Sequence, residues 1–410
     1  MSDATLSRTV WAELHVESFI APAFVAEFVF HSPQVIDVTQ KEVADFLIHR
    51  GDQGLLVSQK CQDDPTSRTG EKLVRWANKK AEEAAGQLKG ALRRVGVPNE
   101  IWCEHRRRGR VSFPNGLPRV DHTIVTVEVI EHVVLQDDLP LEHVGTPISY
   151  LSVSDFMNLS LQLRTVPEAL RYLEARRALP AAVQRTIGSE QLLFAYYLLH
   201  DGDFAGFTSL DDTRAMLLQH RDALAAILDA KAERDRFALV LEHVADQLAG
   251  RHPHYKEGLS QAAIDSYEPD GERQGYLVMQ GLIAGLMLGE RAELGQAFDG
   301  VIALRKAGHG LTHVQAMVSS HPEYVFILGS FVENNSSTRN NLLLSFDAFA
   351  RAAMAYYGRT RCLIIFDRDG KSYEVAHAEL AGPSTPADVE NGEKLFGHLK
   401  VFPREIHVRP

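Results

Sequence analysis

The sequence predicts an α/β (α+β) protein, with a mixed sheet flanked by helices in residues 1–180 and a mostly helical domain with a small β element in residues 181–410. Three observations predict this fold. Two apolar segments flank a tight turn at residues 50–54, as in a β-hairpin. A long amphipathic segment over residues 70–95 follows. A β-branched segment over residues 122–134 then predicts a further strand.

The N-terminal elements follow from local periodicity. Residues 8–24 have the apolar spacing of a helix, and residues 24–30 alternate loosely as in a strand. In the hairpin that follows, Asp45 begins the first strand and Lys60 ends the second. The helix after the hairpin has an apolar stripe in which residues recur every three or four positions: Leu73, Ala77, Ala81, Ala84, Leu88, Leu92 and Val95.

The later elements are predicted in the same way. Residues 101–103 and 111–113 indicate a second hairpin around a basic turn, and residues 148–153 a further strand. Helices are predicted over residues 155–163 and 167–178.

Beyond residue 180 the pattern changes, and the domain boundary is placed there. Long helical patterns dominate this region, at 189–200, 209–249, 272–290, 292–307 and 340–357. Its predicted strands are 324–331, 362–366 and 372–375.

Composition narrows the class of protein. A chain of 410 residues with 45% hydrophobic and 24% charged residues is typical of a soluble globular protein of two domains. Three widely spaced cysteines fit a reducing cytosol and predict neither a zinc nor a disulfide framework. We expect a cytoplasmic protein without a membrane partner, because neither a signal peptide nor a bilayer-spanning apolar segment is visible.

Positive charge is concentrated directly after the first hairpin. The formal net charge of -11 argues against a non-specific nucleic-acid coat protein, yet residues 72–110 hold eleven basic and four acidic residues. A basic surface beside an acidic metal site suits phosphodiester cleavage, whereas a solvated helix face and a charged turn explain the same residues without a function. The candidate nucleic-acid contacts among them are Lys72, Arg75, Lys79, Arg106, Arg107 and Arg108.

Asp45 and Lys60 are the strongest candidate site residues. A hairpin brings its strand ends together, so this acid and this lysine are expected to meet beside two apolar strands. Lysine is rarely buried without a partner, and an acid beside a lysine at a strand end suits a metal-dependent phosphodiesterase. The structural alternative is that Asp45 is a polar strand-end residue that caps a turn.

The succession of Asp45, a turn, an apolar strand and Lys60 resembles the PD-(D/E)XK, or restriction-endonuclease-like, nuclease superfamily over about residues 8–135. The resemblance implies a nuclease in which Asp45 and a helix glutamate hold Mg²⁺ or Mn²⁺ and Lys60 assists the hydrolytic water. Glu17 is the first candidate for that glutamate and the second metal ligand, Glu13 the next, and Glu27, on a predicted strand, the third.

The motif departs from the superfamily pattern at two positions. Ala44 replaces the usual proline, which the superfamily tolerates, and Ser58 replaces the acid expected two residues before Lys60. A hydroxyl is a poor ligand for a hard divalent cation, so Ser58 would at most bind through water or contact a phosphate. Gln59 points to the opposite face of an ideal strand.

Three glutamines near the motif are further candidates. Gln59 and Gln62 are expected to contact nucleic acid, while Gln87 on the following helix would support the site or pack in the core.

The predicted function is metal-dependent phosphodiester hydrolysis in bacterial defence or DNA processing, with DNA as the expected partner and RNA as the alternative. The competing interpretation is a catalytically degenerate module of the same fold that binds nucleic acid or serves in assembly. A third is a protein-binding scaffold, in which residues 181–410 form a homo-oligomer or bind a protein partner.

Overall fold

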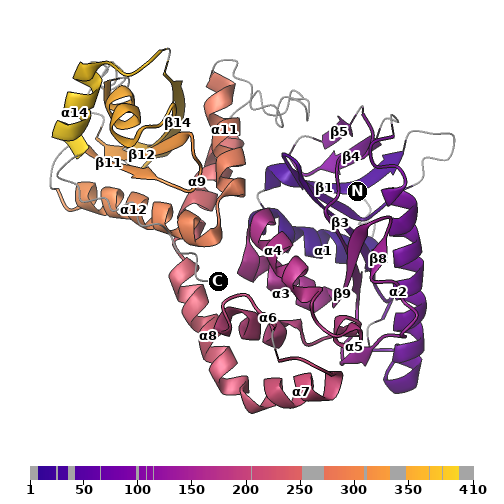
Figure 1. Cartoon of the computed structure of the whole chain (residues 1–410). Coiled ribbons are helices and arrows are strands. Elements are labelled where there is room, and N and C mark those ends of the chain that lie inside the picture. Colours follow the sequence, from indigo (N-terminus) through magenta and orange to yellow (C-terminus); the bar gives the residue numbers. More distant parts are fainter. Residues whose placement is uncertain are drawn as a thin grey trace, which may run out of the picture. The chain divides into compact units, whose positions relative to one another are not determined.

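The computed structural model describes residues 8–396, apart from 25, 36–41, 65, 98–100, 108, 114, 205, 252–271, 309–311, 333–347, 369 and 381. The chain divides into two units, with the boundary along the sequence between Glu233 and Arg234 (Figure 1). Each unit has its own sheet and its own hydrophobic core.

The first unit is built on an eight-stranded mixed sheet in the order β5-β4-β1-β2-β3-β6-β9-β8. The neighbours β3, β6 and β9 are parallel, and the other pairs are antiparallel. Its strands are β1 (Val29–Val35), β2 (Phe46–Arg50), β3 (Gln53–Lys60), β4 (Ile101–His105), β5 (Gly109–Phe113), β6 (His122–Val127), β8 (Glu142–His143) and β9 (Thr146–Ser152). The short strands β7 (Val133–Val134) and β10 (Thr186–Ile187) form a separate pair.

The predicted first hairpin is present, with Arg50 of β2 paired to Gln53 of β3. Its turn is Gly51–Asp52, where Gly51 has φ 59°, a left-handed conformation that glycine adopts without steric cost. The second hairpin, β4–β5, also forms. The predicted strand over residues 122–134 ends at Val127, and the carboxylate of the next residue, Glu128, accepts a backbone hydrogen bond from the loop after β3.

Helices cover both faces of this sheet (Figure 1). On one face lies α2 (Gly70–Leu92), whose predicted stripe is buried from Leu73 to Leu92. The helix ends before Val95, which bridges to Leu117 instead. The opposite face is covered by α1 (Arg8–Ala23), α3 (Val153–Leu163), α4 (Val166–Arg176) and α6 (Glu190–Leu199).

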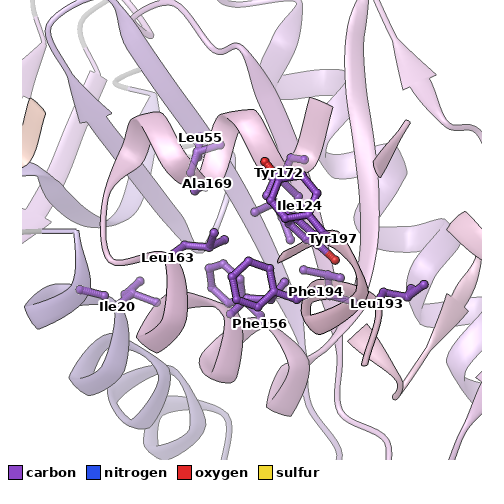
Figure 2. Packing of buried hydrophobic residues seen from close by; sticks show 14 of the residues in the cluster. Ile20, Leu55, Ile124, Phe156, Leu163, Ala169, Tyr172, Leu193, Phe194 and Tyr197 are labelled. Carbon is purple, nitrogen blue, oxygen red and sulfur yellow. The ribbon is translucent and has the colours of Figure 1, made fainter. Parts of the chain in front are cut away.

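Strand alternation assigns the apolar residues to these two layers. Leu56 and Val125 face α2. Leu55, Val57 and Ile124 face the layer of α3, α4 and α6, and Figure 2 shows Leu55 and Ile124 in this layer.

Aromatic rings fill the centre of that second layer. The ring of Tyr172 meets Phe194 and Tyr197 edge to face, with centroids 5.2 and 5.1 Å apart (Figure 2). Such pairs add about 0.5–1.5 kcal/mol to the effect of burial. The same core includes Leu217 and Leu224, so the first unit extends beyond residue 180, where the sequence pattern changes.

Three further helices complete the first unit: α5 (Ala181–Gln184), α7 (Leu210–Gln219) and α8 (Arg221–Asp235). The long helical pattern over residues 209–249 is thus interrupted, and its last part forms α9 (Ala238–Arg251).

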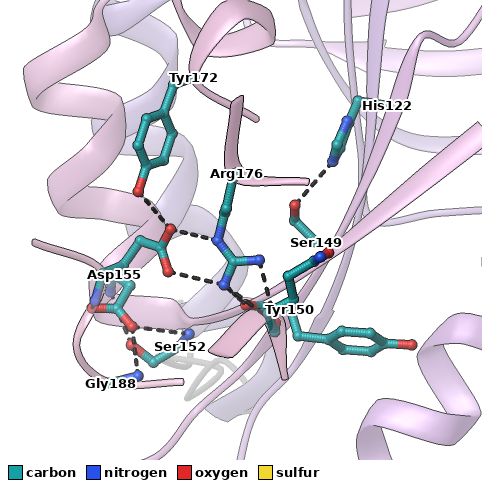
Figure 3. A network of polar contacts seen from close by, with 10 residues as sticks. His122, Ser149, Tyr150, Ser152, Asp155, Tyr172, Arg176 and Gly188 are labelled. Carbon is teal, nitrogen blue, oxygen red and sulfur yellow. Dashed lines mark hydrogen bonds and ion pairs between the residues drawn. The ribbon is translucent and has the colours of Figure 1, made fainter. Parts of the chain in front are cut away.

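A buried ion pair ties these layers together. Arg176, only 1% exposed, donates from Nε to Glu190 Oε1 at 2.5 Å and from Nη2 to Glu190 Oε2 at 3.0 Å (Figure 3). The hydroxyl of Tyr172 donates to the same Oε1 at 2.6 Å. The guanidinium also donates to the carbonyls of Gln184 and Tyr150. The pair therefore links β9 and α4 to the start of α6.

The second unit is built on a four-stranded sheet of β11 (Thr312–Val318), β12 (Tyr324–Phe331), β13 (Arg361–Arg368) and β14 (Ser372–Glu379), in that order. The neighbours β12 and β13 are parallel. Its helices include α11 (Glu272–Gly285), α12 (Leu288–Lys306) and α14 (Pro386–Phe396). Residues 348–357 are also helical, as predicted for the end of the 340–357 segment, whose first residues lie outside the described part of the chain. The expected mix of helices with a β element is found, and β11 was not predicted. Throughout the described part of the chain, no helix is both long and apolar enough to span a bilayer.

Candidate functional site

Asp45 lies in the bend just before β2, and its side chain is 6% exposed. Its Oδ2 accepts a 2.6 Å hydrogen bond from the backbone N–H of Gln59, and its own N–H donates to the carbonyl of Val57 at 3.0 Å. These bonds hold the carboxylate against the end of β3. The structure therefore brings Asp45 to the strand end that carries Lys60, as the hairpin pattern predicts.

Lys60 and Ser58 share one partner on α2. Lys60 Nζ donates to Gln87 Oε1 at 3.0 Å, and Ser58 Oγ donates to the same oxygen at 3.1 Å. Residues two apart on a strand point to the same face, which here is the face covered by α2. From the sequence, Gln87 is expected either to support the site or to pack in the core. In the structure its side-chain oxygen positions the lysine.

Two carboxylates in this region have raised pKa values. Burial raises the pKa of Asp45, while Lys60 and the Gln59 N–H oppose this effect and Glu13 adds to it. Burial likewise raises the pKa of Glu42, with further contributions from Asp45 and Glu13. Glu13, Glu42 and Asp45 are therefore close enough to repel one another when all are ionised. We call Glu13, Glu42, Asp45 and Lys60 the Asp45 cluster.

His31 of β1 borders the Asp45 cluster. Its Nε2 lies 3.5 Å from Glu13 Oε2, and its ring is tilted against Phe46 with centroids 5.0 Å apart. Burial lowers the pKa of His31, but Glu13, Glu17 and Glu42 together outweigh burial, so that the pKa is raised. The charges around this imidazole are thus predominantly negative.

The structure distinguishes the three candidate glutamates. Glu13 raises the pKa values of both Asp45 and His31, and Glu17 contributes to the raised pKa of His31. Glu27 does not lie on a strand as predicted: it belongs to the short 3₁₀ helix η1 (Ala26–Phe28).

Glu27 is instead part of a separate buried ion pair. Its Oε1 accepts a 2.8 Å bond from Arg107 Nη1, and its Oε2 lies 3.9 Å from His105 Nε2. Glu27 and Arg107 are 80 positions apart in sequence. Arg107, a predicted nucleic-acid contact, thereby anchors the β4–β5 hairpin to η1.

The side-chain amides of Gln59 and Gln62, which are predicted to contact nucleic acid, make hydrogen bonds within the protein. Gln59 Nε2 donates to Cys61 Sγ at 3.1 Å. Gln62 donates to the carbonyl of Glu128 at 3.1 Å and accepts from Arg68 Nη1 at 3.0 Å. Both side chains would have to exchange these bonds to contact a nucleotide.

The other predicted basic contacts are exposed. Lys72, Arg75 and Lys79 lie on the outer surface of α2, and Arg106 lies in the β4–β5 turn. Arg108 falls outside the described residues. Lys79 and Lys60 both act on the pKa of Glu83, which is lowered chiefly by its hydrogen bond with Lys80. Lys60 and Lys79 therefore both lie within electrostatic range of Glu83.

The donor chemistry of the Asp45 cluster suits a hard divalent cation. Mg²⁺ and Mn²⁺ prefer carboxylate oxygens, which Glu13, Glu42 and Asp45 supply, and a cation would relieve their mutual repulsion. Within the part of the chain that the structure describes, however, no three acidic, histidine or cysteine side chains converge as a ready-made metal cage. The carboxylates would have to move closer together around an ion.

Sequence reasoning missed Glu42 and His31. Glu42 precedes Asp45 by three residues, and His31 lies on the preceding strand, so neither belongs to the acid-and-lysine motif that directed attention to the hairpin. Comparison with known proteins adds no further candidate, because no family model, curated protein or solved structure matches this chain.

Proposed function

We propose that the first unit is a metal-dependent nuclease that hydrolyses phosphodiester bonds, with DNA as its substrate. The observation that carries the proposal is the placement of the Asp45 carboxylate and the Lys60 ammonium group at the same end of the β2–β3 hairpin, where Asp45 is bonded to the Gln59 N–H, Gln87 positions the lysine, and the lysine acts on the pKa of Asp45. A mixed sheet with helices on both faces is also what the resemblance to restriction-endonuclease-like nucleases implies, and it supports the proposal.

Each residue has a distinct role in this proposal. Asp45, Glu13 and Glu42 would hold Mg²⁺ or Mn²⁺, with Glu13 in the place first assigned to Glu17. The ion would act as a Lewis acid and lower the pKa of a bound water. Lys60 would place its positive charge where negative charge develops on the phosphate, and Gln87 would hold its amine in reach. A role in bacterial defence or DNA processing rests on fold-level analogy.

The second candidate function is a catalytically degenerate module that binds nucleic acid. Ser58 favours it, because this buried side chain occupies the position of the second acid and its hydroxyl bonds to Gln87. In that case nucleic-acid binding would survive removal of divalent metal, and no substrate would be cut.

A cleavage assay separates the two proposals. Plasmid, linear duplex and single-stranded DNA, and RNA, are incubated with the full chain in Mg²⁺, in Mn²⁺ or in a chelator. The nuclease proposal predicts metal-dependent cleavage, preferably of DNA. Binding without cleavage in every metal would favour the degenerate module.

A further inference from the structure

We propose that Trp102 and Arg110 form a stacking platform for an unpaired nucleotide on the sheet face that carries His31, at the border of the Asp45 cluster. This inference deepens the proposed function, on which it rests, by naming single-stranded nucleic acid as the ligand.

Strand register places the platform on an open face of the sheet. Along β4 and β5, Ile101, Cys103 and His105 are buried on the α2 face. The alternate residues point the other way, and there Trp102 is half-buried while Glu104 and Arg110 are exposed. This end of the sheet is therefore covered on one face only among the residues described.

The same register connects the platform to the Asp45 cluster. Arg110 pairs with Glu104, and Glu104 pairs with His31 of β1. Paired residues share a face, and neighbouring strands are about 4.8 Å apart, so His31 lies about 10 Å from Arg110 across the sheet. The imidazole of His31 in turn lies 3.5 Å from Glu13. The platform therefore lies about two strands from His31, on the side of the sheet where His31 and Glu13 border the cluster and opposite the α2 face that Lys60 occupies.

The chemistry of the platform suits a base rather than a duplex backbone. The guanidinium carbon of Arg110 lies 4.5 Å from the centroid of the Trp102 ring, a cation–π contact. The guanidinium group is itself planar, so together with the indole ring it offers a base a planar surface on which to stack. Paired bases inside a duplex do not expose their faces, so the platform requires an unpaired strand.

Charge near the platform is positive but limited. Arg106 is exposed in the adjoining turn, while Arg107 is paired with Glu27 and Glu104 faces Arg110. With few uncompensated cations, phosphate attraction alone would be weak. Stacking is therefore expected to supply most of the binding, and to distinguish single strands from duplexes.

Fluorescence of Trp102 tests the platform directly. In the full chain carrying Trp11→Phe and Trp76→Phe, Trp102 is the remaining tryptophan. A fluorescein-labelled oligothymidine is titrated in chelator, with binding followed by anisotropy and stacking by quenching of Trp102. We expect both signals to change together, and a duplex of the same length to bind more weakly.

Substitution of Arg110 supplies the affinity test. Arg110→Ala should weaken oligothymidine binding about 5- to 10-fold, the lower range for loss of one stacking contact. It should also reduce by about one the magnitude of the salt slope, which is the slope of the logarithm of the binding constant against the logarithm of the salt concentration. Arg110→Lys should restore the salt slope but not the affinity, because an ammonium group has no plane. The control is Arg119→Ala, an exposed arginine paired with Asp121.

Three results would overturn the inference: no oligothymidine binding, binding without quenching of Trp102, or an unchanged affinity in Arg110→Ala. Metal-dependent cleavage is measured separately. Cleavage without a functioning platform would refute this inference alone, whereas platform binding without cleavage would refute the nuclease proposal alone.

Discussion

Removal of the buried guanidinium of Arg176 should destabilise the first unit severely. In Arg176→Met, the Glu190 carboxylate stays buried, at 1% exposure, and loses both of its bonds to the guanidinium. The Gln184 carbonyl also loses a donor. Deleting one partner of a buried ion pair typically costs about 3–5 kcal/mol, because the other charge is left uncompensated. A cost in that range would be a large fraction of the stability of a typical domain.

The next residue offers a matched control. Arg177 is 43% exposed in its side chain and pairs with the exposed Glu174 at 2.8 Å. Arg177→Met removes the same group from water-screened surroundings, where ion pairs contribute about 0–1 kcal/mol. All three tryptophans, at positions 11, 76 and 102, lie in the first unit, so their fluorescence during urea unfolding reports on that unit.

A double-mutant cycle tests the physical reason. If the cost of Arg176→Met comes from the stranded carboxylate, Glu190→Gln should recover part of it, and the two single costs should not add. A midpoint for Arg176→Met that equals that of Arg177→Met, or strict additivity with Glu190→Gln, would refute the reasoning.

Three further predictions concern the Asp45 cluster. Because the folded state raises the pKa of Glu42, ionisation of this carboxyl group opposes folding. Glu42→Gln should therefore stabilise the protein at pH 7, and the gain should shrink as pH falls from the raised folded-state pKa to the ordinary pKa of a glutamate and be absent below it. A gain that is constant across pH would contradict this cause. Mn²⁺ at about 100 times its dissociation constant should stabilise the wild type by about 2.7 kcal/mol and Asp45→Asn much less, which thermal unfolding measures. Lys60→Met should lower the cleavage rate about 100-fold, with a smaller loss in Gln87→Leu; equal rates in Lys60→Met and wild type would exclude the proposed role of the ammonium group.

The parts of the fold that sequence predicts well are those set by neighbouring residues. The first hairpin depends on the Gly51–Asp52 turn and on apolar strands beside it, and α2 on a stripe that recurs every three or four residues. Both signals lie within a short window, so the meeting of Asp45 and Lys60 could be anticipated.

Long-range pairing explains what sequence did not predict. Val133 and Val134 are β-branched, but they pair with Thr186 and Ile187 instead of extending β6. Glu27 finds Arg107, 80 residues away.

The choice among the helix glutamates is also a matter of tertiary packing. Glu13 and Glu17 lie one turn apart on α1, so the helical pattern from which Glu17 is placed first cannot show which of the two approaches the site. Only the position of α1 relative to β1 shows that Glu13 approaches His31 and acts on Asp45.

The most direct test of the central claim is the cleavage rate of DNA in Mn²⁺ for wild type, Asp45→Asn and Asp52→Asn. Asp52 is an exposed acid in the turn of the same hairpin, so its replacement changes charge without touching the cluster. The account predicts cleavage by wild type and Asp52→Asn and none by Asp45→Asn. Equal cleavage by wild type and Asp45→Asn, or no cleavage by any of the three, would contradict it.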